Sequence, residues 1–264
     1  MQETYQRLKE IIGKGTPERF EFITKEIKSL GLESKIYEIT SSRGKDKHLT
    51  VSFNYNHQKE LWLTANYDTY DIFPSGNNNG SGVVTLIGLS QRLRDVSLPI
   101  NVRIVYFDAA LDILLASKGK RNPDFIPGSK LFLQHMIEEN IEFIDTYYGA
   151  ITVQAVGKGD LCVFEKTGKN YINTNNLNHL IIKHAKELGI NVSMGDNSPN
   201  ADNISFIKEG LDATVLTRYH EGSWHKMQTK EDDINNLNVN IVDETIKFLF
   251  DFLQSIDLGE RHND

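Results

Sequence analysis

The feature that most constrains this chain is the alternation of strand-like and helix-like segments from residue 60 onward. Short apolar runs indicate strands, and apolar residues spaced three and four apart indicate amphipathic helices. Strands separated by helices are joined by crossover connections, which place them parallel in one sheet. The pattern therefore predicts an α/β fold with a mostly parallel central sheet flanked by helices. The expected strands are 60–65, 101–107, 149–156 and 213–217, and the expected helices are 82–93, 129–139, 177–188, 204–209 and 239–255.

The N-terminal region is predicted to extend the same domain. Residues 1–31 have the pattern of two helices, and the second begins at Thr16-Pro17-Glu18. There a capping hydroxyl, a first-turn proline and an acid near the positive helix end coincide. Two more strands are expected at 35–40 and 48–53. Because no linker or repeat interrupts the sequence, residues 1–264 are predicted to form a single domain with the N-terminal helices packed on the core.

Composition excludes several classes of protein. The 264 residues include 29 basic and 36 acidic side chains, a net charge of −7, whereas nucleic-acid-binding domains normally carry a basic face. The single cysteine excludes an intramolecular disulfide. No apolar run approaches the roughly 18 residues of a membrane span, and the first ten residues lack the apolar segment of a secretion signal. We therefore expect a cytoplasmic protein with neither a nucleic-acid nor a membrane partner.

Polar residues gather directly after the predicted strands, where parallel sheets bind their ligands. Taken singly, each is explained as a turn or capping residue. Their shared placement makes a functional site the better interpretation. These residues are Asn66, Asp68, Asp71, the segment Asn77-Asn78-Asn79-Gly80-Ser81-Gly82, Asp108, Asp112, Asp202, His220 and His225.

Several of these segments follow one another in a characteristic order. In chain order they are Asn66-Tyr67-Asp68, Pro74-Ser75-Gly76-Asn77-Asn78-Asn79-Gly80-Ser81-Gly82, Asp108-Ala109-Ala110-Leu111, Gly128-Ser129, Asp202-Asn203-Ile204-Ser205-Phe206 and Trp224-His225 with Asp232-Asp233 and Asn236-Leu237 after it. In these motifs the chain resembles the M28 zinc aminopeptidases and their glutaminyl cyclase branch. The resemblance implies the three-layer α/β sandwich of the zinc exopeptidases, which is also the phosphorylase/hydrolase-like fold.

The resemblance also implies that most zinc ligands of the family are replaced in this chain. The family's ligand positions correspond to Asn66, Asn78, Leu111, Gln154 and His225, and its general-base glutamate corresponds to Ala110. Hydrolytic zinc sites use about three imidazole or carboxylate ligands. Amides lack the negative charge, and leucine and alanine neither coordinate a metal nor transfer a proton. We therefore expect no metal and no cofactor here, and no inherited zinc-hydrolase mechanism.

The leading hypothesis is a pseudo-peptidase that binds a peptide, an amino acid or a protein partner without cleaving it. By resemblance, Asp202 and Trp224 lie where the cyclases shape their substrate pocket. The expected binding residues are Asn66, Asn78, Gln154, Asp202, Trp224 and His225. Two structural alternatives stay open, because Trp224 can instead be a packed aromatic that supports its loop and Asp202 an N-cap of the following helix.

The second hypothesis is a working enzyme with rebuilt chemistry, an amide hydrolase or acyl-transfer enzyme acting on amino-acid or peptide substrates. Its candidate catalytic residues are Asp68, Asp202 and His225, with Asp108 and Asp112 as further carboxylates. These groups would form an acid/base pair or a remodelled one-metal site. Zinc belongs only to that remodelled version.

The remaining residues with reactive or metal-binding side chains have simpler explanations. Ser81 lacks the flanking glycines of a nucleophile elbow and is interpreted as a small residue at a helix start. Cys162 lies within a strand pattern and is expected in the core. His179 and His184 lie five residues apart on one helix, on different faces, and are expected at the surface.

Overall fold

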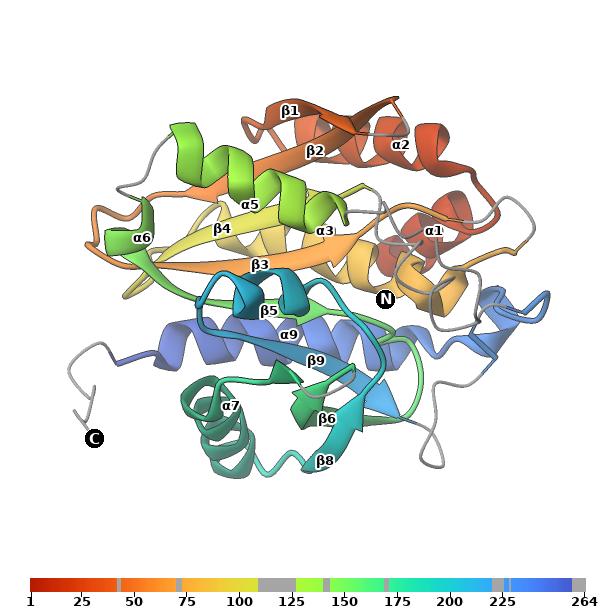
Figure 1. The fold of residues 1–264 in the computed structure, drawn as a ribbon. Coiled ribbons are helices and arrows are strands. Elements are labelled where there is room, and N and C mark those ends of the chain that lie inside the picture. The colour runs from red at the N-terminus through yellow and green to blue at the C-terminus, as the bar shows by residue number, and fades with distance from the viewer. Residues whose placement is uncertain are drawn as a thin grey trace.

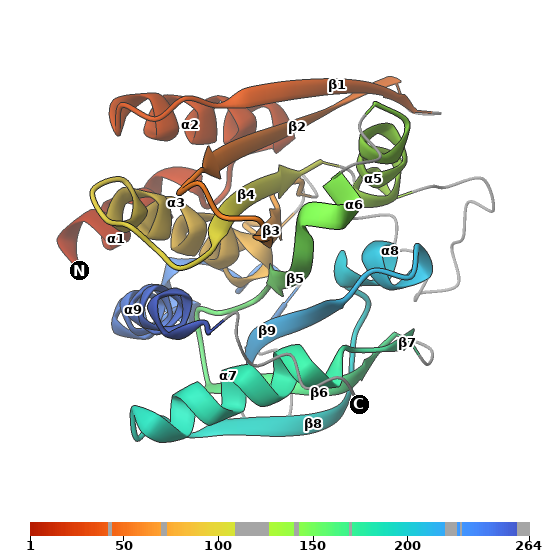
Figure 2. The ribbon, with the colours of Figure 1, turned by 90° about the vertical axis from the view of Figure 1, so that its left-hand side faces the viewer.

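The computed structural model describes residues 1–41, 44–69, 73–108, 127–139, 143–168, 171–219, 226–227 and 229–257. The strands in these ranges form one sheet in the order β1-β2-β4-β3-β5-β9-β6-β7, and β8 pairs with β6 (Figures 1 and 2). They are β1 (Lys35–Ser41), β2 (Gly44–Phe53), β3 (Glu60–Asn66), β4 (Asn101–Phe107), β5 (Tyr147–Val153), β6 (Asp160–Thr167), β7 (Tyr171–Ile172), β8 (Val192–Ser198) and β9 (Ala213–Tyr219).

The centre of the sheet is parallel, as predicted. β4, β3, β5 and β9 run in the same direction. β2 runs antiparallel to both of its neighbours, β1 and β4, and β6 runs antiparallel to β9 and β7. Because parallel strands end on the same side, the carboxyl ends of β3, β5 and β9 meet at one edge.

Helices cover both faces of the sheet and give three layers (Figure 2). α1, α2, α3 and α9 lie on one face, and α5, α6 and α8 lie on the other. The helices are α1 (Gln2–Ile11), α2 (Thr16–Ser29), α3 (Ser81–Leu93), α5 (Gly128–Glu139), α6 (Phe143–Thr146), α7 (Asn175–Glu187), α8 (Asn203–Lys208) and α9 (Val239–Ser255), with the short segments η1 (Gly76–Gly80) and η2 (Ile234–Asn236).

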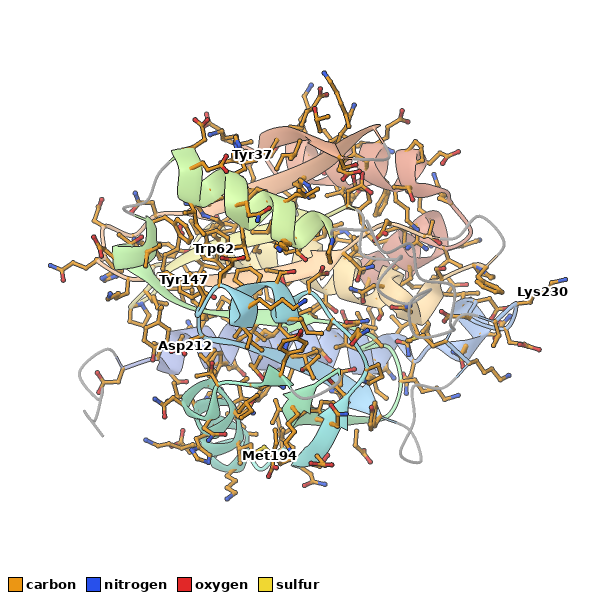
Figure 3. The ribbon with its side chains drawn as sticks, in the orientation of Figure 1. Tyr37, Trp62, Tyr147, Met194, Asp212 and Lys230 are labelled. Atoms are coloured by element: carbon orange, nitrogen blue, oxygen red, sulfur yellow. The ribbon has the colours of Figure 1, made fainter. Side chains whose placement is uncertain are left out.

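Each face of the sheet has its own apolar core. The larger cluster joins the sheet to α1, α2, α3 and α9, and the smaller one is aromatic and lies under α5, α6 and α8. Trp62 is at its centre, with its ring 5.8 Å from that of Tyr147 and 6.1 Å from that of Phe132 (Figure 3). Its indole N–H donates to Glu60 at 2.8 Å, so the buried polar atom is satisfied.

The two N-terminal helices pack against the larger apolar cluster. Leu8 and Ile11 of α1 and Ile23 and Ile27 of α2 are fully buried in the larger cluster. Buried Arg7 joins the helices, because its Nε donates to Glu26 of α2 at 2.7 Å. Within the described ranges, no helix combines the length and apolar character needed to cross a membrane.

The structure changes one interpretation of the histidines. His179 is exposed as expected, but His184 is buried between α7 and α9, with its ring 5.7 Å from Phe248 and 5.9 Å from Phe252. The prediction for His184 was wrong because His184 follows Ile181 by three residues and therefore lies on the buried face of α7 with Leu177 and Ile181. Cys162 is buried, as predicted.

Candidate functional site

The carboxyl edge of the parallel strands brings three of the predicted residues together. Thr64 of β3 and Thr152 of β5 are register partners, with hydroxyls 2.9 Å apart. Two residues further along, on the same face of the sheet, are Asn66 at the end of β3 and Gln154 directly after β5. The η1 segment then returns to this edge and adds Asn78.

These three amide side chains are almost wholly buried and hydrogen-bonded. Their exposed fractions are 2–3%. Asn66 donates from Nδ2 to Asp68 at 3.1 Å and accepts at Oδ1 from Asn79 at 3.2 Å. Gln154 donates to Asn78 Oδ1 at 3.4 Å. Each of the three buried amides therefore has a side-chain hydrogen-bond partner, as is usual for buried polar groups.

Asn79 links this cluster to the backbone, a role that the sequence analysis, which named Asn79 only within its segment, did not predict. Its Nδ2 also donates to the Val153 carbonyl at 3.0 Å, and its Oδ1 accepts from the N–H groups of Gly82 and Ala155 at 3.2 and 3.1 Å. A Cβ on Gly82 would lie 2.3 Å from Asn79 Oδ1 and 2.5 Å from the Val153 carbonyl. Only glycine therefore lets the start of α3 approach this amide.

A carboxylate from the C-terminal region holds the η1 segment. Asp232 accepts from the backbone N–H groups of Asn77 at 2.7 Å and Asn78 at 3.2 Å, and its own carbonyl accepts from Gly76 at 2.7 Å. Burial raises the pKa of Asp232, and the hydrogen bonds from Asn77 and Asn78 oppose that rise. Asp232 thus fixes the backbone that carries Asn78.

Asp202 lies directly before α8, and its carboxyl group is buried. Asp202 occupies the N-cap position of α8, but its side chain makes no capping hydrogen bond. Burial raises the pKa of Asp202 to about 6, against a hydrogen bond from Ser129 that lowers it. Its Oδ1 has no hydrogen-bond partner among the described residues. A buried acid with an open acceptor is suited to a ligand's donor group or to proton transfer.

The other predicted carboxylates are placed differently. Asp68 is buried and accepts from Asn66, so it belongs to the amide cluster. Asp108 is only half-buried and accepts from the backbone N–H of Lys47 at 3.2 Å, which ties β2 to the end of β4. Ser81 begins α3, and its hydroxyl donates to the Asn77 carbonyl at 2.9 Å, as expected for a residue at a helix start.

The sequence analysis also missed Arg19, a fully buried arginine of α2. It donates to the carbonyls of Pro74 and Ser75, immediately before η1, at 3.1 and 2.9 Å. The signal was present in the sequence, because Arg19 lies one turn before Ile23 on the face of α2 that turns inward. A charged residue in line with an apolar stripe indicates a buried partner.

Several predicted residues lie outside the described ranges. They are Asp71, Ala110, Leu111, Asp112, His220, Trp224 and His225. Among the residues that the structure does describe, no three His, Cys, Asp or Glu side chains come close enough together to hold a metal ion.

A comparison with known protein families explains why these motifs occur together in one chain. The sequence profile of Peptidase family M28 matches residues 49–253, which is most of the chain. The chain belongs to peptidase family M28. The match includes the strands β3 to β9, η1 and Asp232, whereas α1, α2 and β1 precede it.

Known proteins similar to this M28 chain include aminopeptidases and glutaminyl cyclases. Aminopeptidase YwaD of Bacillus subtilis (strain 168) is 22% identical over 165 residues, which are 61% of this chain but only 32% of that protein. The M28 chain thus aligns with about a third of this curated relative.

Solved structures show the same fold. A Zn-dependent exopeptidase from Parabacteroides distasonis has a TM-score of 0.74 at 14% identity. The similarity covers 96% of the M28 chain and 97% of the exopeptidase chain. A glutaminyl cyclase from Fimbriiglobus ruber also has a TM-score of 0.74, at 16% identity, with 97% and 93% covered. At these identities the likeness establishes the zinc-exopeptidase fold alone.

Proposed function

We propose that this M28 chain is a non-hydrolytic, peptidase-like binding protein. Its ligand is a peptide, an amino acid or the terminal segment of a protein partner, held at the carboxyl edge of β3, β5 and β9. The observation that carries this proposal is the amide cluster. Asn66, Asn78 and Gln154 stand at three positions assigned by family resemblance to zinc ligands, and all three use amide groups in hydrogen bonds to neighbouring side chains.

Zinc, which the family implies, fits these described residues poorly. Asn66 points an N–H at Asp68, where a ligand would need a lone pair, and its Oδ1 already accepts from Asn79. The three amides bring no negative charge to offset the dehydration of a divalent ion. Two further family positions, Leu111 and His225, lie outside the described residues, and leucine offers no ligand at the first of them.

Asp202 supports the binding part of the proposal. Its Oδ1 is buried and open among the described residues, so a donor such as an α-amino or amide N–H would relieve the cost of leaving it unpaired. The relatives are aminopeptidases and glutaminyl cyclases by name. Peptides and free amino acids are therefore the first ligands to test.

The first experiment measures the metal content of tag-free protein expressed with added zinc, by elemental mass spectrometry. We expect a stoichiometry near zero, no change in melting temperature with Zn²⁺ or a chelator, and no release of amines from aminoacyl reporters. Calorimetry with a peptide library should then find a ligand whose affinity falls at least tenfold in Asp202→Asn. One bound zinc per chain, or turnover that a chelator removes, would contradict the proposal.

A second candidate function is an enzyme with rebuilt acid/base chemistry, because the pKa of Asp202 is raised to about 6. A carboxyl group that titrates near the working pH is suited to proton transfer. This reading predicts turnover of an aminoacyl or peptide substrate without metal, with a rate that changes around pH 6. Asp202→Asn should abolish that turnover and leave the unfolding transition cooperative. Ligand binding without turnover in the wild-type protein would favour the first candidate.

A restored site tests the assignment of family positions. Asn66→His, Asn78→Asp, Leu111→Glu and Gln154→Asp, made together, should create zinc affinity, because His225 completes the ligand set that the resemblance implies. The matched control carries the same four changes with His225→Ala and should bind zinc more weakly. Equal, weak zinc binding in both proteins would show that the positions are assigned wrongly.

A further inference from the structure

Arg19 is a charged side chain buried near the site, and its surroundings are unusual for an arginine. It is 0% exposed. Its Nε donates to the Lys14 carbonyl at 3.1 Å, and its Nη2 donates to the carbonyls of Pro74 and Ser75 at 3.1 and 2.9 Å. Its Nη1 has no acceptor among the described residues. The guanidinium group thus carries a full positive charge in the protein interior, and it donates hydrogen bonds to uncharged backbone carbonyls.

Two buried carboxylates of the site lie within electrostatic reach of this charge. Burial lowers the pKa of Arg19 to about 10, and the attraction of Asp68 and then Asp232 works against that fall. The group therefore remains protonated at neutral pH. Arg19 in turn favours the charged form of Asp232. A buried charge persists only when charges or hydrogen bonds compensate it.

Arg19 and Asp232 bind complementary groups of the same stretch of backbone. Arg19 donates hydrogen bonds to the carbonyls just before η1. The Asp232 carboxylate accepts hydrogen bonds from the N–H groups of Asn77 and Asn78 within η1. Between these contacts, Ser75 has φ 52°, a left-handed conformation that is unfavourable for a serine. The bond from Arg19 to the Ser75 carbonyl stabilises the turn at this point.

We propose that Arg19 is the fixed internal cation of this site. It positions the η1 segment, and with it Asn78 and Asn79, and its charge balances Asp68 and Asp232. Arg19 acts through its neighbours and is a positioning residue. The role extends beyond the proposed function, because it holds whether or not a peptide binds. Arg19 belongs to α2, which precedes the residues matched by the family profile.

The test measures folding equilibria by urea unfolding for Arg19→Met, which removes the charge, and Arg19→Lys, which keeps it. We expect Arg19→Met to lower the folding equilibrium constant by about 10²- to 10³-fold, as for a buried pair that loses one partner. Arg19→Lys should retain at least a tenfold larger constant than Arg19→Met. Combining Arg19→Met with Asp232→Asn, and separately with Asp68→Asn, completes two double-mutant cycles. At least one carboxylate substitution should lower the folding equilibrium constant by a factor roughly ten times smaller in the Arg19→Met protein than in the wild-type protein.

The matched control is Arg7→Met, which removes another buried arginine of the N-terminal helices, paired instead with Glu26 and Glu3. It should destabilise the protein but show no coupling to Asp232→Asn. If Arg19→Met does not fold, a folded Arg19→Lys protein supports the role of the charge. Equal loss in Arg19→Lys and Arg19→Met, failure of both to fold, or absence of coupling to either carboxylate would overturn the proposal.

Discussion

Replacing Asn79 with alanine should test whether the amide cluster is a rigid part of the fold. Asn79 is fully buried and makes four hydrogen bonds through its side chain, to Asn66, Val153, Gly82 and Ala155. Each contributes about 1 kcal/mol net. Because three of the partners are backbone groups that cannot turn elsewhere, we expect Asn79→Ala to lower the free energy of unfolding by about 3–5 kcal/mol.

Urea unfolding followed by circular dichroism measures this loss. The control is Asn178→Ala, a fully buried asparagine of α7 that bonds to the Phe164 carbonyl at 2.8 Å, far from the cluster in the sequence. Both variants should be destabilised, but only Asn79→Ala should also weaken binding of any peptide found for the site. If Asn79→Ala lowered the free energy of unfolding by less than about 1 kcal/mol, the reasoning would be refuted. Water would then satisfy the hydrogen-bond partners of the lost amide at little cost.

Three further predictions concern other parts of the structure. Because burial raises the pKa of Asp202 to about 6, the folded protein holds this proton more tightly than the unfolded chain, so stability should fall as pH rises from about 4 to about 6. Asp202→Asn should remove this part of the pH dependence, which amounts to about 2–3 kcal/mol in the free energy of unfolding. Urea unfolding measured between about pH 4 and about pH 6 tests this. A pH profile that the substitution leaves unchanged would contradict the buried placement of Asp202. Gly82→Ala should lower the melting temperature far more than Gly80→Ala, whose added Cβ would meet its nearest atom at 3.1 Å rather than 2.3 Å; equal melting temperatures would count against the close approach. Trp62→Ala should cost about 3–5 kcal/mol in urea unfolding and weaken the packing of α5, whereas a loss under about 1 kcal/mol would mean that Trp62 is not central to the aromatic core.

The sequence predicts the regular elements well where periodicity is strong. The strand at 101–107 and the helix at 239–255 agree with β4 and α9. The strand expected at 149–156 ends earlier, at Val153. Ala155 has φ 52°, and its N–H, like that of Val156, bonds to the side chains of Asn79 and Ser81 and not to a strand. The apolar run continued, but these tertiary hydrogen bonds ended the strand.

The candidate site is only partly readable from sequence. The position of Asn66 and Gln154 at strand ends follows from the α/β pattern, and Asn78 is placed there by its motif. β8 was not predicted, because its polar sequence shows no strand period and it forms by pairing with β6. The contacts of Asp232 with η1 span 154 and 155 residues, and no local pattern specifies such a distance.

The position of β9 within the sheet has a consequence for how the chain is made. Among the strands that the structure describes, β9 is the last to be synthesised, yet it lies between β5 and β6 (Figure 2). Until residues 213–219 leave the ribosome, β5 and β6 each present an unpaired edge, and the two halves of the sheet share no strand. Exposed edges of this kind pair readily with other chains. A nascent chain that stops before Ala213 should therefore depend on chaperones more than the full-length protein does.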